Sequence, residues 1–174
     1  MTVPGVICIF LFIVFTFSGV SKLMKLRDFE ATLEQLGLMN RFGTAAKYFV
    51  PLLEIAAAAF LIFRVTRGYG ELLVIILLFC FGWAVWRAMH NAQKIECNCF
   101  GELAPEKFGW STLIKISVIL TLTVILVISK EEIDYNNSSS FDLVNAIFLS
   151  VSIILNYALM TSIIDSRVNK PRRP

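Results

Sequence analysis

The chain has 174 residues, of which 57% are apolar and only 17% are charged, whereas an ordinary soluble domain has about 45–50% and about 25%. The mean hydropathy of +0.73 means that the chain cannot cover its own surface with polar groups. This composition excludes a soluble globule and a disordered chain. The net charge of +3 is too small to indicate a nucleic-acid-binding protein.

Five apolar stretches reach, or nearly reach, the length of about 20 residues that a membrane-spanning helix needs. A helix satisfies its own backbone hydrogen bonds, so each stretch is predicted to be α-helical in lipid. No basic residue precedes the first stretch and no small-residue cleavage site follows it, so we interpret it as a retained span and not as a signal peptide. The predicted spans cover residues 3–26, 46–63, 70–89, 110–129 and 141–164.

The connection between the first two spans carries Phe29, Leu33 and Leu36 at helical spacing. This pattern predicts a short amphipathic helix, either lying on the membrane surface or serving as an ordinary connector. Asp28 is placed to cap the start of this helix, and Gly37 is placed to end it.

Loop lysines and arginines favour the cytoplasmic side of a membrane. The spans form one transmembrane domain, residues 1–166. It is followed by a basic tail, residues 167–174, which we expect to be disordered. With five spans, 13 of the 16 basic residues lie on one side, which places the N-terminus outside and the C-terminus in the cytoplasm. The three on the other side are Arg64, Arg67 and Lys130.

Cys97 and Cys99 form the sharpest chemical signal in the sequence, and they lie between the third and fourth predicted spans. Extended residues two apart are separated by about 7 Å, whereas a disulfide prefers a Cα separation of about 5.5–6 Å. The backbone must therefore turn at Asn98, and a bond in so tight a loop should be easily reduced. Redox exchange is the favoured interpretation over a static disulfide, inert thiols or a metal half-site. The metal half-site is the least favoured, because a zinc site needs a second pair of ligands.

Charged residues inside predicted spans are costly and therefore informative, and Lys22 and Glu54 are the two of interest. Lys22 lies near the end of the first span and Glu54 about a third of the way into the second. Antiparallel neighbours bring both residues near the membrane face that carries the cysteine loop. We expect an ion pair, which either locks two helices together or handles protons.

His90, the only histidine, ends the third span seven residues before Cys97. It could assist proton transfer to the two thiols, although a histidine at a helix end is more often a cap or an interface residue. Cys8 and Cys80 lie inside spans, and we interpret them as small apolar core residues. Cys80 could act as a resolving thiol only if the cysteine loop dipped into the bundle.

Three sequence elements together resemble the MauE/DoxX group of redox-associated bacterial membrane proteins, over about residues 5–128. They are Phe17-Ser18-Gly19-Val20-Ser21-Lys22-Leu23, Pro51-Leu52-Leu53-Glu54 and Cys97-Asn98-Cys99-Phe100-Gly101. The resemblance implies an all-α integral membrane protein of the bacterial inner membrane, with a four-helix transmembrane bundle similar in layout to vitamin K epoxide reductase. The fifth predicted span is then an additional C-terminal helix.

The resemblance also implies a redox-active Cys97–Cys99 pair that exchanges with a thioredoxin-like or other thiol protein, with Lys22 and Glu54 as buried residues of interest. A membrane quinone could take the electrons, although no cofactor is certain. The alternative is a non-catalytic structural or assembly subunit of a larger membrane complex. Disulfide-forming members should act outside the cytoplasm, whereas the charge count places this cysteine loop inside.

Overall fold

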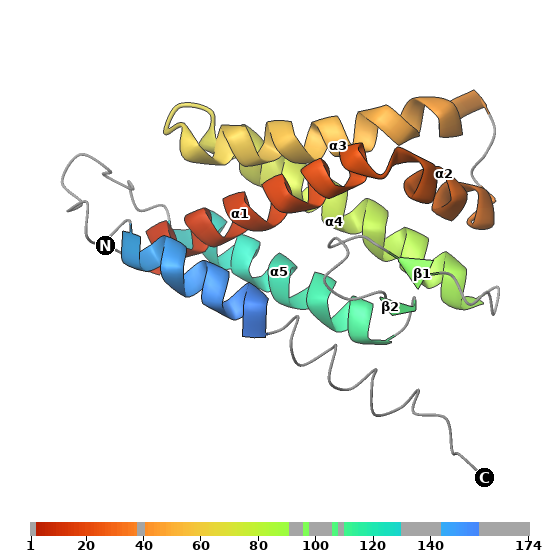
Figure 1. Cartoon of the computed structure of the whole chain (residues 1–174). Helices are drawn as coiled ribbons and strands as arrows, with labels where there is room; N and C mark the ends of the chain where they lie inside the picture. The colour runs from red at the N-terminus through yellow and green to blue at the C-terminus, as the bar shows by residue number, and fades with distance from the viewer. Residues whose placement is uncertain are drawn as a thin grey trace, which may run out of the picture.

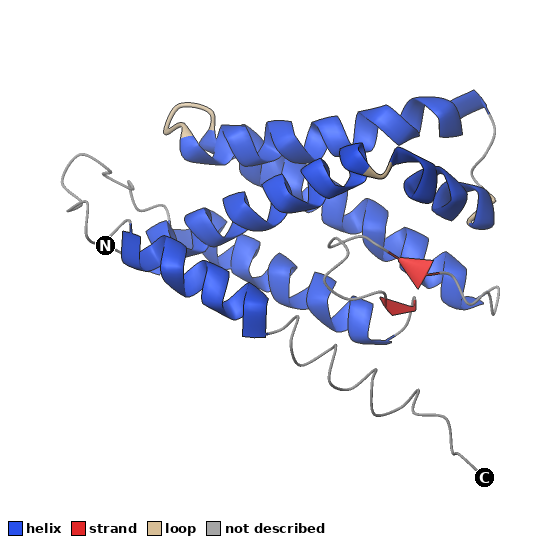
Figure 2. Ribbon diagram, in the orientation of Figure 1, coloured by secondary structure: helices blue, strands red, loops and turns tan. Residues whose placement is uncertain are grey.

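The structure, a computed structural model, describes residues 3–37, 41–90, 96–97, 106–107, 110–129 and 144–156. Helices make up almost all of these residues, and two very short strands lie at one end of the bundle (Figure 2). The elements are α1 (Val3–Met24), α2 (Leu26–Gln35), α3 (Arg41–Ile62), α4 (Arg67–His90), β1 (Glu96–Cys97), β2 (Glu106–Lys107) and α5 (Trp110–Ser129). A further helix covers Val144–Asn156.

Four of these helices are long and apolar enough to cross a membrane: Val3–Met24, Ala45–Ile62, Arg67–His90 and Thr112–Ser129. This confirms the predicted all-α bundle, and the protein is a multi-pass membrane protein. The helix Val144–Asn156 lies within the predicted fifth span but is shorter than a span requires. The end of that segment, residues 157–164, lies outside the described residues, so its crossing stays a prediction.

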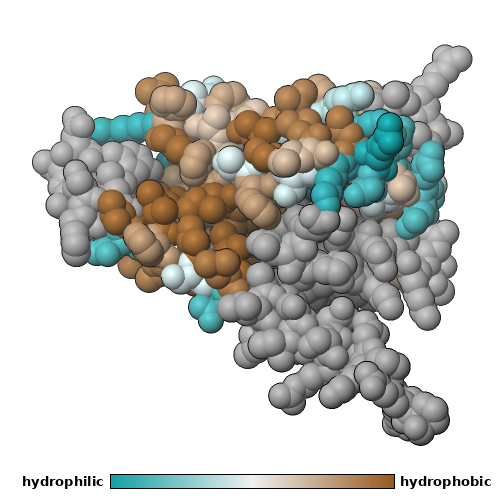
Figure 3. Space-filling model, viewed as in Figure 1, coloured by the Kyte–Doolittle hydropathy of each residue, from teal (hydrophilic) through white to brown (hydrophobic). Residues whose placement is uncertain are grey.

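The four long helices pack in a closed order (Figure 1). α1 contacts α3 and α5, and α4 contacts the same two helices. Apolar side chains from all four helices fill the centre, including Leu11, Leu61, Val74 and Leu126. Large apolar side chains also cover the outside, as the brown surface in Figure 3 shows. Such a surface would be an anomaly in water and is the expected one in lipid.

The contact between α1 and α3 depends on Gly19. A Cβ atom added there would lie 2.8 Å from Ile55 Cγ1 and 2.9 Å from the carbonyl oxygen of Pro51. The carbonyl oxygen belongs to the backbone of α3 and cannot rotate away. Because small residues let transmembrane helices approach closely, Gly19 sets the spacing at which the polar groups of α1 and α3 can meet.

The short helix predicted after the first span is present as α2, but Asp28 does not cap it. Its N-cap residue is Lys25, which makes no side-chain capping bond, and Asp28 lies within the first turn. α2 follows α1 after one residue, so the chain has no room for a separate capping turn. Gly37 follows the helix with a positive φ of 69°, a conformation that glycine adopts without strain.

We predict that Gly19→Ala destabilises the bundle by about 1–3 kcal/mol, the usual cost of overpacking a tight contact. The measurement is reversible unfolding in mixed micelles followed by circular dichroism. Gly68→Ala is the matched control, because a Cβ atom at Gly68 would meet none of the residues that the structure describes within 4 Å. Equal stability of the two variants would contradict the assignment of Gly19 as the contact that sets the helix spacing.

Candidate functional site

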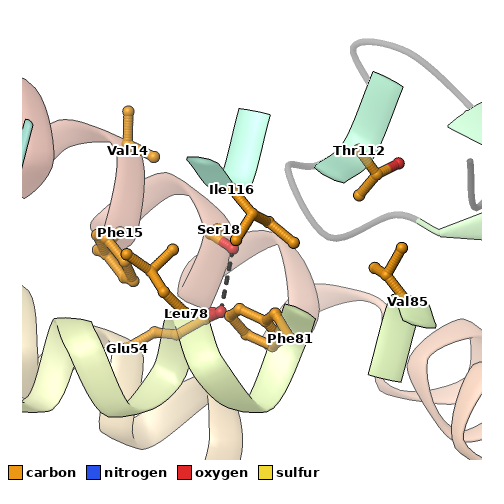
Figure 4. Close-up of a pocket in the computed structure, with 9 residues that line it drawn as sticks. All are labelled: Val14, Phe15, Ser18, Glu54, Leu78, Phe81, Val85, Thr112 and Ile116. Carbon is orange, nitrogen blue, oxygen red and sulfur yellow. Dashed lines mark hydrogen bonds between the residues drawn. The ribbon is translucent and has the colours of Figure 1, made fainter. Parts of the chain in front are cut away.

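A buried polar cluster joins α1 to α3 inside the apolar bundle. Lys22 Nζ forms an ion pair with Glu54 Oε1, and both side chains are buried. Lys22 Nζ also donates to Ser18 Oγ at 2.9 Å, and Ser18 Oγ donates to Glu54 Oε1 at 3.2 Å. Figure 4 shows the serine and the glutamate facing each other between the helices. The structure therefore brings together the two charged residues that the sequence singled out.

The local sequence explains how this cluster forms. Ser18 and Lys22 are four residues apart, so they lie one turn apart on the same face of α1. Gly19 lies between them and allows α3 to approach closely. The Cβ atom of Glu54 is 3.3 Å from the position that a Cβ atom would take if residue 19 had a side chain. Sequence reasoning did not find the hydrogen bonds of Ser18, although its spacing from Lys22 carried that signal.

Aromatic rings enclose the ammonium group of Lys22. Lys22 Nζ lies 4.6 Å from the centroid of the Phe81 ring on α4 and 5.8 Å from that of Phe29 on α2. A cation over an aromatic face is stabilised electrostatically, more so away from water. The two rings therefore complete a shell around a charge that would be costly in lipid. Sequence reasoning used Phe29 only as part of the apolar pattern of the short helix, and it assigned no role to Phe81.

A small cavity adjoins the carboxylate of Glu54. Its volume is about 10 Å³, which corresponds to roughly one water molecule. Glu54 Oε2 is buried and has no hydrogen-bond partner among the described residues. Phe81, Val85 and Thr112 place part of the cavity lining towards the end of the bundle where α4 ends and α5 begins (Figure 4). The volume does not accommodate a quinone ring.

The connection between α4 and α5 holds the cysteine motif. β1 pairs with β2 in antiparallel register, with Glu96 opposite Lys107 and Cys97 opposite Glu106. This pairing fixes the backbone of Cys97 near the end of α4. The side chain of Cys97 and the whole of Cys99 lie outside the described residues, so a bond between the two sulfurs stays a prediction.

His90 ends α4 with an exposed side chain that stacks on Trp86, with ring centroids 5.9 Å apart. The other two cysteines differ in their surroundings. Cys8 is fully buried and donates from Sγ to the carbonyl oxygen of Leu61 at 3.2 Å, as expected of a core residue. Cys80 is exposed on α4, so its interpretation as a core residue was wrong.

Comparison with known protein families identifies the chain. The model of one family, described as methylamine utilisation protein MauE, matches residues 1–129. The chain belongs to the MauE family. The match begins before α1 and ends with the last residue of α5, so it covers the four long helices and the cysteine motif. Members of the MauE family are membrane proteins of methylamine utilisation. The match does not extend to the DoxX part of the expected resemblance.

The helix Val144–Asn156 lies beyond the MauE match. Searches of curated proteins and of solved structures each gave no match.

The ion pair generates a stability prediction. Glu54→Leu leaves Lys22 buried without its counter-charge, and we expect it to lower the free energy of unfolding by about 3–5 kcal/mol. Lys22→Met should have a similar cost, because it leaves the carboxylate unpaired. The double variant removes both charges and should recover most of the loss. Reversible unfolding in mixed micelles measures this cycle, and a double variant whose loss equals the sum of the two single losses would contradict the pairing.

Proposed function

We propose that this MauE-family protein is a membrane thiol–disulfide redox protein whose reactive pair is Cys97 and Cys99. The observation that carries the proposal is the position of the Cys-x-Cys motif. The backbone of Cys97 lies seven residues after the end of α4, in a strand that pairs with β2 at one end of the bundle. A thiol pair in such a connection is within reach of a second protein at the membrane surface.

The proposed reaction is a balanced exchange. A partner thiolate attacks one sulfur of the Cys97–Cys99 disulfide, and a mixed disulfide forms as the other sulfur leaves as a thiolate. The second thiol of the partner then attacks the partner's own sulfur in the mixed disulfide. The cysteine that was first attacked leaves as a thiolate, and the partner leaves with its own disulfide. Two electrons and two protons pass from the partner dithiol to Cys97 and Cys99. The partner is a thioredoxin-like or other dithiol protein.

The strand pairing supports an easily reduced bond. Cys97 occupies a β-strand, and extended residues two apart are about 7 Å apart. A disulfide needs a Cα separation of about 5.5–6 Å, so the chain must leave the extended conformation directly after Cys97 for the bond to close. Strained disulfides have more oxidising potentials and take part in exchange.

His90 has a proposed part in the proton transfer. It is exposed at the last residue of α4, on the side of the bundle from which the cysteine connection departs. An imidazole can accept a thiol proton or return one. A membrane quinone stays a proposed acceptor of the electrons, at a place other than the small cavity beside Glu54.

Thiol trapping tests the proposal. In purified protein, Cys97 and Cys99 should react with a maleimide after reduction and be protected after oxidation. In cells, Cys97→Ser or Cys99→Ser should trap a partner in a mixed disulfide that reductant releases. Cys80→Ser is the control and should trap none. A pair whose labelling never changes across redox buffers, with no trapped partner, would instead favour a structural or assembly role in a larger membrane complex.

The charge distribution generates a topology prediction. We infer that the N-terminus lies outside the bacterial inner membrane and that the connection carrying Cys97 faces the cytoplasm. In intact cells, a membrane-impermeant maleimide should then label a single cysteine at Arg64→Cys, between α3 and α4, but not a single Cys97. Permeabilised cells should allow both to be labelled. The opposite pattern would reverse the orientation and place the thiol chemistry outside the cytoplasm.

A further inference from the structure

The outward face of α4 changes character along its length. Six exposed residues follow one another at intervals of three or four, which places them on a single helix face. The first three are aliphatic or phenyl side chains, and the last three are indole and imidazole rings. The six are Leu72, Ile76, Phe79, Trp83, Trp86 and His90.

The ring-bearing end of this stripe is held in place and carries a permanent cation. Arg87 Cζ lies 5.6 Å from the centroid of the Trp83 ring, and Arg87 Nε donates to the carbonyl oxygen of Leu36 at 3.3 Å. The two terminal guanidinium nitrogens carry four further N–H donors. Trp86 stacks on His90 beside this group. Two indoles and a guanidinium therefore stand together at one level of the helix.

Gly82 adds an observation that packing does not explain. At Gly19 and Gly70, an added Cβ would meet backbone atoms of a neighbouring segment within 3 Å. An added Cβ at Gly82 would meet no atom of the described residues within 4 Å. Glycine weakens a helix, and here it permits no close approach between helices. It lies three residues after Phe79 and four before Trp86, so it leaves a notch on the flank of the stripe.

The length of α4 fixes the depth of these groups. Its 24 residues extend about 36 Å at about 1.5 Å per residue, which exceeds the hydrocarbon core of about 30 Å. The last turn therefore lies at headgroup level, where tryptophan is favoured. At the same end of the bundle, near the start of α3, Lys47 Nζ lies 5.6 Å from the centroid of the Tyr48 ring.

We propose that the stripe binds an anionic phospholipid, with an acyl chain along Ile76, Phe79 and the Gly82 notch and the phosphate on Arg87. The order of the residues matches the order of the ligand: apolar in the bilayer, aromatic at the interface and cationic at the headgroup. A soluble protein partner would not reach Leu72, Ile76 and Phe79, which lie at the depth of the hydrocarbon core. The proposal is independent of the thiol chemistry.

Quenching by brominated lipids tests the site. In a Trp110→Phe background, emission comes only from Trp83 and Trp86, because the chain has three tryptophans. The protein is reconstituted in bilayers containing either an anionic or a zwitterionic phospholipid with the same brominated chains. A guanidinium near the surface should favour the anionic lipid by about fivefold in relative binding constant. Equal quenching by the two lipids overturns the proposal.

Two variants and two controls give the result its specificity. Arg87→Gln should lower the anionic preference to near one, whereas Arg87→Lys keeps the charge and should retain most of it. Gly82→Leu fills the notch in open space and should abolish the preference while helicity and elution volume stay unchanged. Arg64→Gln removes one charge from the opposite end, and Gly68→Leu fills another open glycine, so both should keep the preference. Full preference in Gly82→Leu and Arg87→Gln would overturn the site.

Discussion

Two opposite charges buried in an apolar bundle are the constraint on which the rest of the structure depends. Lys22 and Glu54 are stable at this depth only as a pair, since either one alone is an uncompensated charge in a medium that cannot solvate it. The pair therefore fixes the register of α1 against α3. It requires Gly19, because any side chain there would push the two backbones apart. One electrostatic requirement thus becomes a steric requirement on a neighbouring residue.

The pair also organises the elements around it. α4 contributes Phe81 and α2 contributes Phe29 to the shell around the ammonium group, so α2 has to fold back over the end of α1. Three further contacts hold α2 there. Glu30 forms an ion pair with Lys47 on α3 at 2.5 Å. The carbonyl oxygen of Leu36, which follows the last residue of α2, accepts a hydrogen bond from Arg87. The side chain of Leu36 packs on Ala88. α2 consequently covers the charged cluster and connects α3 with α4.

The sequence predicted the features that carry a large free energy in lipid. It missed the features whose free energy in lipid is small. The spans and the meeting of Lys22 with Glu54 were predictable, because apolar length and buried charge carry large free energies. The outward position of Cys80 was not, since apolar residues face both the core and the lipid and their spacing no longer marks the inside. The contacts of Phe29 and Phe81 depend on helix rotation, which spacing within one helix does not fix. The prediction that Asp28 caps α2 was wrong, because α2 follows α1 without a turn between them.

α4 links the buried cavity to the proposed lipid stripe through a few side chains. Its inner face closes the cavity beside Glu54 with Phe81, and its outer face carries the proposed lipid stripe. Arg87 stands between these faces, because it contacts Trp83 on the outside and the end of α2 through Leu36. A phosphate bound to its terminal nitrogens would hold the guanidinium in the position from which Nε reaches Leu36. Lipid binding would thereby stabilise α2 in the position that places Phe29 over Lys22. A series of contacts would then connect the headgroup layer to the buried charge without any rearrangement of the bundle.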